Sequence, residues 1–133
     1  MPDLPFEEYG DLEACAAEQG QEPILLMTPT NTPERLRAIG QKARGFVYAV
    51  ARKGVTGQKT DLDEDLGGQL GRYREATDLP LALGFGLRVG DDLRRLHGKA
   101  EVAIVGSALL DCWEKQGSGA FASLMADLAG ARA

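Results

Sequence analysis

The sequence has few of the features that mark several large classes of protein. None of its apolar runs approaches the ~20 residues that a membrane helix needs. Its two cysteines, Cys15 and Cys112, lie far apart and fit no metal or redox spacing, so we expect reduced thiols and no metal site. Its one histidine, His97, is expected to end a helix rather than to act in catalysis.

Acidic residues outnumber basic ones, 20 to 15. The formal net charge of -5 argues against a general nucleic-acid partner or an anionic membrane surface, although a local basic group can still serve a small anion. The first residues, Met-Pro-Asp-Leu-Pro, carry neither the basic region nor the apolar core of a signal peptide, so none is expected. The reduced cysteines indicate a cytoplasmic location. The 133 residues suit one domain, whereas a full (β/α)8 barrel needs about 250.

Repeated β-loop-α units predict the fold. Apolar runs begin at positions 24, 46, 81 and 102, and each is followed by a loop of Gly, Pro or Thr and then by a helical pattern. Such units form parallel strands with right-handed crossovers, so the class is α/β. We divide the single domain 1–133 into a leading turn and helix, 1–22, and four β/α units, 23–133. The units are expected to keep barrel curvature, with open edge strands and an apolar inner face that either a self-complementary dimer or a missing N-terminal half would cover. The alternative is a flatter sheet with helices on both faces.

Helix boundaries are indicated at several points. Gly20 is expected to end the first helix, and Thr32 to cap the second with Pro33 at its first position. A helix over 62–76 is marked by three glycines, which indicate either a marginal helix or a close helix contact: Gly67, Gly68 and Gly71. A last helix over 120–129 is expected to place one apolar face in the core: Phe121, Leu124, Met125 and Leu128.

Three loops carry signals for ligand binding. The stretch 45–57 is a strand followed by a loop with glycines around Val55 and Thr56, which suits a mobile lid or an ordinary connection equally well. The glycines of 84–86 allow a backbone to approach an anion. Ser107 follows Gly106 at the expected start of a helix, where it either faces an anion or caps the helix, and both are compatible. Arg88 either reinforces anion binding or is solvated.

Five motifs in order resemble one family. They are the stretch 45–57, Pro2-Asp3-Leu4-Pro5, Thr28-Pro29-Thr30, Leu83-Gly84-Phe85-Gly86 and Val105-Gly106-Ser107-Ala108. Their order and approximate spacing resemble the C-terminal half of the tryptophan synthase α chain, a (β/α)8 barrel that cleaves indole-3-glycerol phosphate to indole and glyceraldehyde 3-phosphate. The resemblance implies half of a TIM barrel, namely strands 5 to 8 preceded by one helix.

The resemblance also implies roles for particular residues. The phosphate would be held by Gly57, Phe85, Gly86, Gly106 and Ser107. Tyr48 and Ile104 would contact the indole end, and Thr56 in the lid loop would position a catalytic aspartate. The family's catalytic Glu and Asp precede the matched part, so no catalytic residue is assigned in this chain. No cofactor is expected.

Three hypotheses remain open. The first is a phosphate-binding half of this lyase, inactive alone, with indole-3-glycerol phosphate or a related ligand and a tryptophan synthase β chain as possible partners. The second is a non-catalytic half-barrel scaffold that forms a homo-oligomer through its exposed strand edges. The third is a small phosphate-sugar enzyme with a rearranged sheet, in which Asp61 would act.

Overall fold

Four parallel strands form one sheet in the computed structural model, which describes residues 4–50, 65–84 and 86–131. The strands are β1 (Leu25–Met27), β2 (Val47–Val50), β3 (Leu81–Gly84) and β4 (Val102–Ile104). Each strand pairs in parallel with the next one along the chain. The expected α/β class and the run of four β/α units are therefore confirmed.

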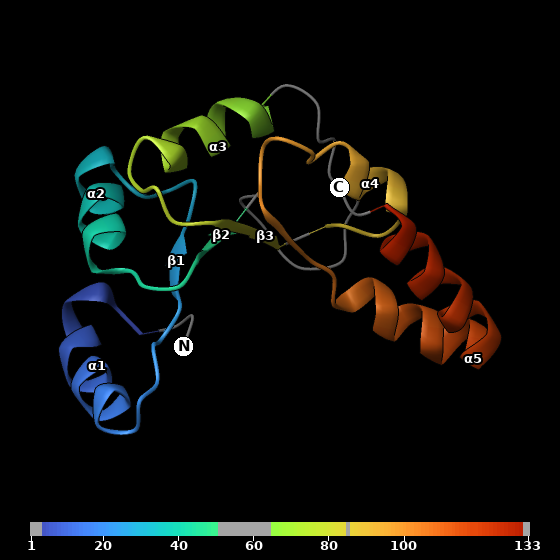
Figure 1. Ribbon diagram of the computed structural model, residues 1–133, viewed down its shortest axis with the longest axis horizontal. Helices are drawn as coiled ribbons and strands as arrows, with labels where there is room; N and C mark the ends of the chain where they lie inside the picture. The colour runs from blue at the N-terminus through green and yellow to red at the C-terminus, as the bar shows by residue number, and fades with distance from the viewer. Residues whose placement is uncertain (1–3, 51–64, 85, 132–133) are drawn as a thin grey trace.

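The helices follow one another along an arc around the strands (Figure 1). They are the 3-10 turn η1 (Phe6–Glu8), α1 (Tyr9–Glu18), α2 (Pro33–Lys42), α3 (Asp65–Arg74), α4 (Gly90–Arg94) and α5 (Ser107–Gly130). In Figure 1, α1 lies at one end of the arc and α4 and α5 lie at the other. Within the described ranges, no helix is long and apolar enough to cross a membrane.

The expected helix ends are present. Gly20 lies just beyond α1 with a φ of 65°, a conformation that glycine adopts without strain, and its N–H donates to Ala17 O. The Oγ1 of Thr32 accepts a hydrogen bond from Arg35 N, and Pro33 occupies the first position of α2.

The glycines of α3 are not required by close packing against another element. A Cβ built on Gly67, Gly68 or Gly71 meets nothing within 4 Å. Of the two explanations that the sequence left open, the close helix contact is therefore wrong. Each glycine costs this helix about 1 kcal/mol relative to alanine, so α3 depends on tertiary packing for its stability.

The core lies on one face of the sheet. The strand residues that point to it are at most 8% exposed, and they pack against apolar side chains of α2 and α3: Leu25, Met27, Val47, Ala49, Leu81 and Leu83 from the strands, and Leu36, Ile39, Leu66, Leu70 and Tyr73 from the helices. The opposite face, which carries Leu26, Tyr48 and Ala82, adds nothing to this cluster. The described residues thus show the one-sided helix layer of a barrel wall, and the alternative of helices on both faces is wrong.

Strand β4 is much more exposed than the other three strands. Val102 is 42% exposed and Ala103 is also exposed, although Ala103 lies on the face that the helices bury in the neighbouring strands. Within the described residues, β1 and β4 each have a neighbour on one side only. The predicted open edges are present, and exposure is concentrated at β4.

A kink divides α5 into two segments. Gly117, with φ 78° and ψ -175°, interrupts the helix near its middle. The second segment is held against α4, because Asp127 Oδ2 accepts a 2.7 Å hydrogen bond from Gly90 N and His97 Nε2 lies 2.9 Å from Ala131 O. The assignment of Met125 to the core is wrong, since its side chain is 44% exposed.

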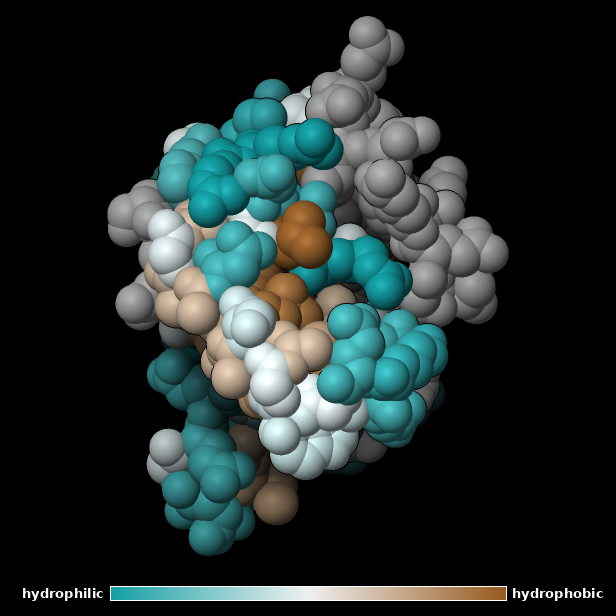
Figure 2. Space-filling view, turned by 90° about the vertical axis from the view of Figure 1, so that its right-hand side faces the viewer, coloured by the Kyte–Doolittle hydropathy of each residue, from teal (hydrophilic) through white to brown (hydrophobic). Residues whose placement is uncertain are grey.

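Large exposed apolar side chains gather toward the C-terminal part of the chain. Among the described residues they are Val89, Val102, Leu110, Trp113 and Met125. Figure 2 looks onto the side of the molecule where α4 and α5 lie, and it shows hydrophobic side chains in the middle of that face among paler and hydrophilic ones. This end of the molecule therefore presents more apolar surface than the α1 end.

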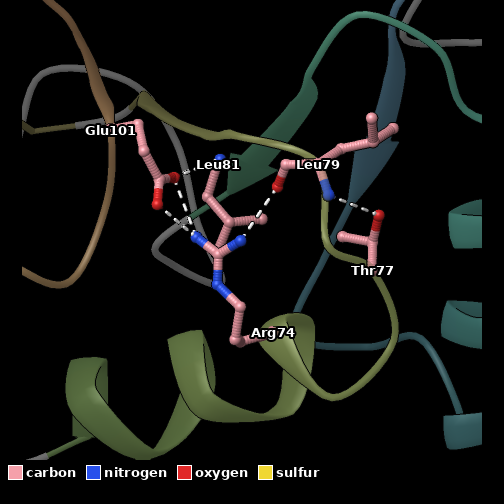
Figure 3. Close-up of polar contacts among 5 residues, drawn as sticks. All are labelled: Arg74, Thr77, Leu79, Leu81 and Glu101. Atoms are coloured by element: carbon pink, nitrogen blue, oxygen red, sulfur yellow. Dashed lines mark hydrogen bonds and ion pairs between the residues drawn. The ribbon is translucent and has the colours of Figure 1, made fainter.

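Arg74 and Glu101 form a polar clamp at the amino end of the sheet (Figure 3). The Nη2 of Arg74 donates to both carboxylate oxygens of Glu101 at 2.7 and 2.8 Å, and its Nη1 donates to Leu79 O. Glu101 Oε2 also accepts a 2.7 Å hydrogen bond from Leu81 N. The clamp ties the end of α3 to the first residues of β3 and β4.

Candidate functional site

Two of the predicted phosphate-binding loops leave the sheet side by side. Gly84 of β3 is in register with Ile104 of β4, and Gly86 and Gly106 each lie two residues beyond that pair. Gly86 has a φ of 83°, which an L side chain adopts only with strain. The sheet therefore places both glycines at its carboxyl end, the end at which (β/α)8 barrels bind their ligands.

The second loop opens directly into the first turn of α5. Gly106 is the N-cap residue, Ser107 is the first helical residue, and no described side chain caps the turn. The reading of Ser107 as N-cap is wrong for this reason. The first amide N–H groups of a helix lack intrahelical acceptors and carry the positive end of the helix dipole, so this turn can accept an anion. Ser107 is exposed, and a Cβ on Gly106 would meet nothing within 4 Å, so no residue of the described ranges blocks the approach to the turn.

Tyr48 and Ile104 border the same loops from the inner face of the sheet. Tyr48 is in register with Ala82, and Ile104 with Gly84, so the side chains of these residues share one face. The tyrosine ring lies over Gly84 so closely that a Cβ at this glycine would collide with its hydroxyl end. Both predicted indole-side residues are half-buried, as an apolar wall beside an anion site requires.

Gly84 was expected from the sequence only to let the backbone approach an anion, and it was not among the residues assigned to the phosphate. A glycine inside a strand marks close approach by a ligand or another group. Here the group is the Tyr48 ring, and the available signal was the position of Gly84 at the end of an apolar strand.

Arg88 is engaged with a neighbouring carboxylate. Its Nη2 lies 3.6 Å from Asp111 Oδ2, and Lys115 Nζ lies 3.1 Å from Asp111 Oδ1. The hydrogen bond and charge of Lys115, joined by the charge of Arg88, hold the pKa of the Asp111 carboxyl below its ordinary value. Arg88 is thus neither simply solvated nor directed at Ser107 as an unpaired cation.

The described carboxylates near these loops are occupied by structural contacts. Asp92 Oδ2 accepts hydrogen bonds from Arg88 N at 2.8 Å and Val89 N at 3.1 Å, and Asp111 carries its two ion pairs. In the described part of the chain, no three His, Cys, Asp or Glu side chains are grouped as a metal site would need. The arrangement offers amide donors, a hydroxyl and an apolar wall, which are groups of the kind that can bind and orient an anion.

Four predicted residues lie outside the described ranges. They are Thr56 and Gly57 of the lid loop, Phe85 between the two glycines, and Asp61 of the third hypothesis. The rest of the predicted set lies in the strands β2 and β4, in the loops that follow β3 and β4, or at the first position of α5: Tyr48, Gly86, Ile104, Gly106 and Ser107.

Comparison with known sequences gives a consistent result. The family described as "Tryptophan synthase alpha chain" matches residues 1–129. The tryptophan synthase alpha chain of Desulforapulum autotrophicum is 45% identical over 117 residues, which cover 88% of this chain and 46% of that relative. The corresponding protein of Desulfotalea psychrophila is 41% identical over 128 residues and is covered to 50%. The chain therefore spans about half the length of these relatives.

Solved structures agree with the sequences. A structure of Mycobacterium tuberculosis tryptophan synthase superposes with a TM-score of 0.84 at 33% identity, covering 98% of this chain and 49% of the solved one. A structure from a study of mutual activation in the tryptophan synthase a2b2 complex of Pyrococcus furiosus has a TM-score of 0.81 at 28% identity, covering 96% and 53%. The four β/α units thus have the arrangement found in half of those chains.

Proposed function

Because the chain belongs to the tryptophan synthase alpha chain family, we propose that it contributes the phosphate-binding half of a site for indole-3-glycerol phosphate. The observation that carries this proposal is the uncapped first turn of α5, reached through Gly106 and lying beside the Gly86 loop. Its amide groups and Ser107 would hold the phosphate, while Tyr48 and Ile104 would border the indole end. Gly57 and Phe85 would complete the phosphate contacts, and Thr56 the lid.

Binding the phosphate positions the reacting part of the substrate without acting on it chemically. Interactions with a remote group of a substrate supply binding energy that orients the reacting centre. Cleavage of the carbon–carbon bond to indole also needs general acids and bases. The described carboxylates near the loops are engaged elsewhere, so we assign no catalytic residue here and propose that this chain alone binds the ligand without releasing indole.

A charge placed at the first turn of α5 tests the phosphate site. We expect glycerol phosphate to bind the purified chain in calorimetry, and Ser107→Asp to abolish that binding because a carboxylate would occupy the positive end of the helix. Ser123→Asp is the matched control, since Ser123 is exposed on the second segment of α5 and bonds Gly119 O. Equal glycerol phosphate binding by both variants and the unmodified chain would contradict the placement of the phosphate site at α5.

A second candidate function is a half-barrel scaffold that self-associates and binds no substrate. The uncovered β4 strand, with Val102 42% exposed, favours self-association. Under this alternative glycerol phosphate produces no heat of binding, and Ser107→Asp leaves the mass in solution unchanged.

The family also suggests a tryptophan synthase β chain as a partner. The support is the a2b2 complex named for the Pyrococcus furiosus relative. Co-elution of the chain with a β chain on size-exclusion chromatography tests this partner, and separate elution at micromolar concentrations would contradict it.

A further inference from the structure

A buried hydrogen-bond network lies where β2 ends. Gln69 of α3, which is 7% exposed, is the only amide or charged side chain buried among the described residues. Its Nε2 donates to Val50 O at 2.8 Å and also to the Oη of Tyr73. The Tyr73 side chain is fully buried, and its Oη donates to the same Val50 O at 3.0 Å. Two side chains of one helix therefore hold one backbone carbonyl.

The network places the end of β2 more definitely than apolar contacts do. An amide or a phenol hydroxyl is costly to bury unless it is hydrogen-bonded, and within the described ranges no buried side-chain nitrogen or oxygen lacks a partner. Gln69 and Tyr73 are four residues apart, so both lie on the same face of α3. Apolar packing is non-directional, whereas a satisfied polar network fixes the positions of its members.

Val50 lies beside the apolar wall of the proposed ligand site. It is the last residue of β2 and follows Tyr48 by two positions, so the two side chains belong to the same face of the sheet. Val50 is in register with Gly84, and the hydroxyl end of Tyr48 lies against that same glycine. A displacement of the end of β2 relative to β3 would therefore move the Tyr48 ring off Gly84.

We propose that Gln69 and Tyr73 are positioning residues for the indole-side wall: by holding Val50 O, they keep the Tyr48 ring over Gly84. The two side chains act from the helix side of the sheet, and Tyr48 lies on the opposite face. A ring that is already in place loses little conformational freedom when a ligand packs against it. The role in binding rests on the proposed function, but the placement of the ring is expected with or without a ligand.

A purely structural role predicts a different result. Loss of the network would then lower the stability of the chain and leave the folded position of Tyr48 unchanged. The polar clamp of Arg74 and Glu101 provides the comparison, because it joins the same helix to the amino end of the sheet. Removing the clamp should lower stability without moving Tyr48.

The variant Gln69→Leu/Tyr73→Phe removes both side-chain donors to Val50 O with little change in side-chain volume. Nuclear Overhauser effects between the ring protons of Tyr48 and the Hα protons of Gly84 measure the contact without any ligand. We expect them in the unmodified chain and expect their loss in the folded variant. If the double variant does not fold, Gln69→Leu alone should weaken the same effects, because one of the two donors is then missing.

Tyr9 is an internal reference for the same spectra. Its Oη donates to Pro23 O at 2.9 Å, between α1 and the segment ahead of β1. Overhauser effects between the Tyr9 ring and Pro23 should persist in every variant that is folded. Their persistence separates a local displacement of Tyr48 from general unfolding.

Calorimetry with two ligands tests the role in binding. The double variant should bind glycerol phosphate as the unmodified chain does, whereas its preference for indole-3-glycerol phosphate should fall about tenfold, because the indole end loses its wall. The control Arg74→Gln/Glu101→Gln should keep both the preference and the Tyr48 contact. Tyr73→Phe alone, which retains the bond from Gln69 to Val50 O, should keep most of the preference.

Two outcomes would overturn the inference. One is a folded double variant that keeps the Overhauser effects between Tyr48 and Gly84. The other is the same loss of these effects in the clamp control, which would mean that any loss of stability moves the ring. An unmodified chain that binds no glycerol phosphate would instead contradict the proposed function, and the Overhauser effects would still decide how Tyr48 is positioned.

Discussion

The two ends of the sheet differ in how their polar groups are satisfied. At the amino end Arg74 and Glu101 satisfy each other and the backbone of Leu79 and Leu81. At the carboxyl end the strands β3 and β4 lead into glycines and into a helix turn that no described side chain caps. The amino end is therefore tied together by polar contacts, whereas the carboxyl end has amide donors that no described side chain uses, and it is the end at which we propose ligand binding.

A glycine at the amino end should give the largest effect on stability. Gly40 of α2 approaches the backbone ahead of β3 so closely that its Cβ would collide with Ala76 O. We expect Gly40→Ala to lower the free energy of unfolding by about 2–3 kcal/mol, because backbone has to move to admit the methyl group. Urea denaturation measures this loss.

The matched control is a glycine with open space around it. Gly71→Ala in α3 should instead stabilise the chain by about 1 kcal/mol through helix propensity, since nothing lies within 4 Å of its Cβ. The contrast between packed and unpacked glycines would be falsified if the two substitutions had the same sign.

High pH should weaken a contact at the carboxyl end of β2. Tyr73 Oη donates to Val50 O at 3.0 Å, and Gln69 Nε2 donates to the same carbonyl at 2.8 Å. Burial, partly offset by the Gln69 hydrogen bond, raises the pKa of the Tyr73 phenol to about 12. Unfolding then releases a proton above the ordinary pKa near 10, so the stabilisation present below pH 10 is lost as the pH rises toward 12.

Denaturation curves at pH 9, 10 and 11 check this effect. The free energy of unfolding should fall by about 1 kcal/mol more in the unmodified chain than in Tyr73→Phe between pH 9 and 11. Parallel pH profiles for the two proteins would show that Tyr73 titrates normally.

Low pH should weaken the clamp at the amino end. Burial raises the pKa of Glu101, but the hydrogen bonds from Leu81 N and Arg74 outweigh it, and the net pKa lies below the ordinary value. A lowered pKa contributes stability above the ordinary value near 4.3 and loses it as the pH falls through the folded-state value. Because both side chains are more than a third exposed, solvent screens the pair and its contribution is about 1 kcal/mol.

Glu101→Gln measures that contribution. At pH 7 we expect the variant to be less stable by about 1 kcal/mol, with the difference fading below about pH 4. Arg37→Gln, at an exposed residue outside the ion pairs of the described residues, is the control with little expected change. A loss that persists undiminished at pH 3 would mean that the carboxylate charge contributes nothing.

The smallest effect on stability is expected at the carboxyl end. Ser107→Ala should change the free energy of unfolding by less than about 0.5 kcal/mol, because Ser107 is exposed and does not cap α5. Glycerol phosphate affinity should fall about tenfold from loss of one hydrogen bond to a charged group. A variant that lost stability but kept its affinity would reverse the assigned roles of the two ends.

Local signals in the sequence predicted the strands and several helix ends correctly. Thr32 followed by Pro33 is enough to predict the start of α2, because both residues act on the adjacent turn. The positions of Ser107 and Met125 were misjudged, since each depends on tertiary structure: where β4 ends relative to Gly106, and what covers the second segment of α5. The pairing of Arg88 with Asp111 and the contact between Tyr48 and Gly84 join separate β/α units, so spacing along one unit does not reveal them.

The sequential strand order has a consequence for how the chain folds. Leu25 pairs with Val47 and Ala82 pairs with Val102, so each of these pairings closes about twenty residues of chain, whereas Val47 and Leu81 enclose more than thirty. Shorter closures cost less chain entropy and form sooner. We therefore expect two βαβ units to form first, β1 with β2 and β3 with β4. The pairing of β2 with β3 is then expected to be the slow step in refolding.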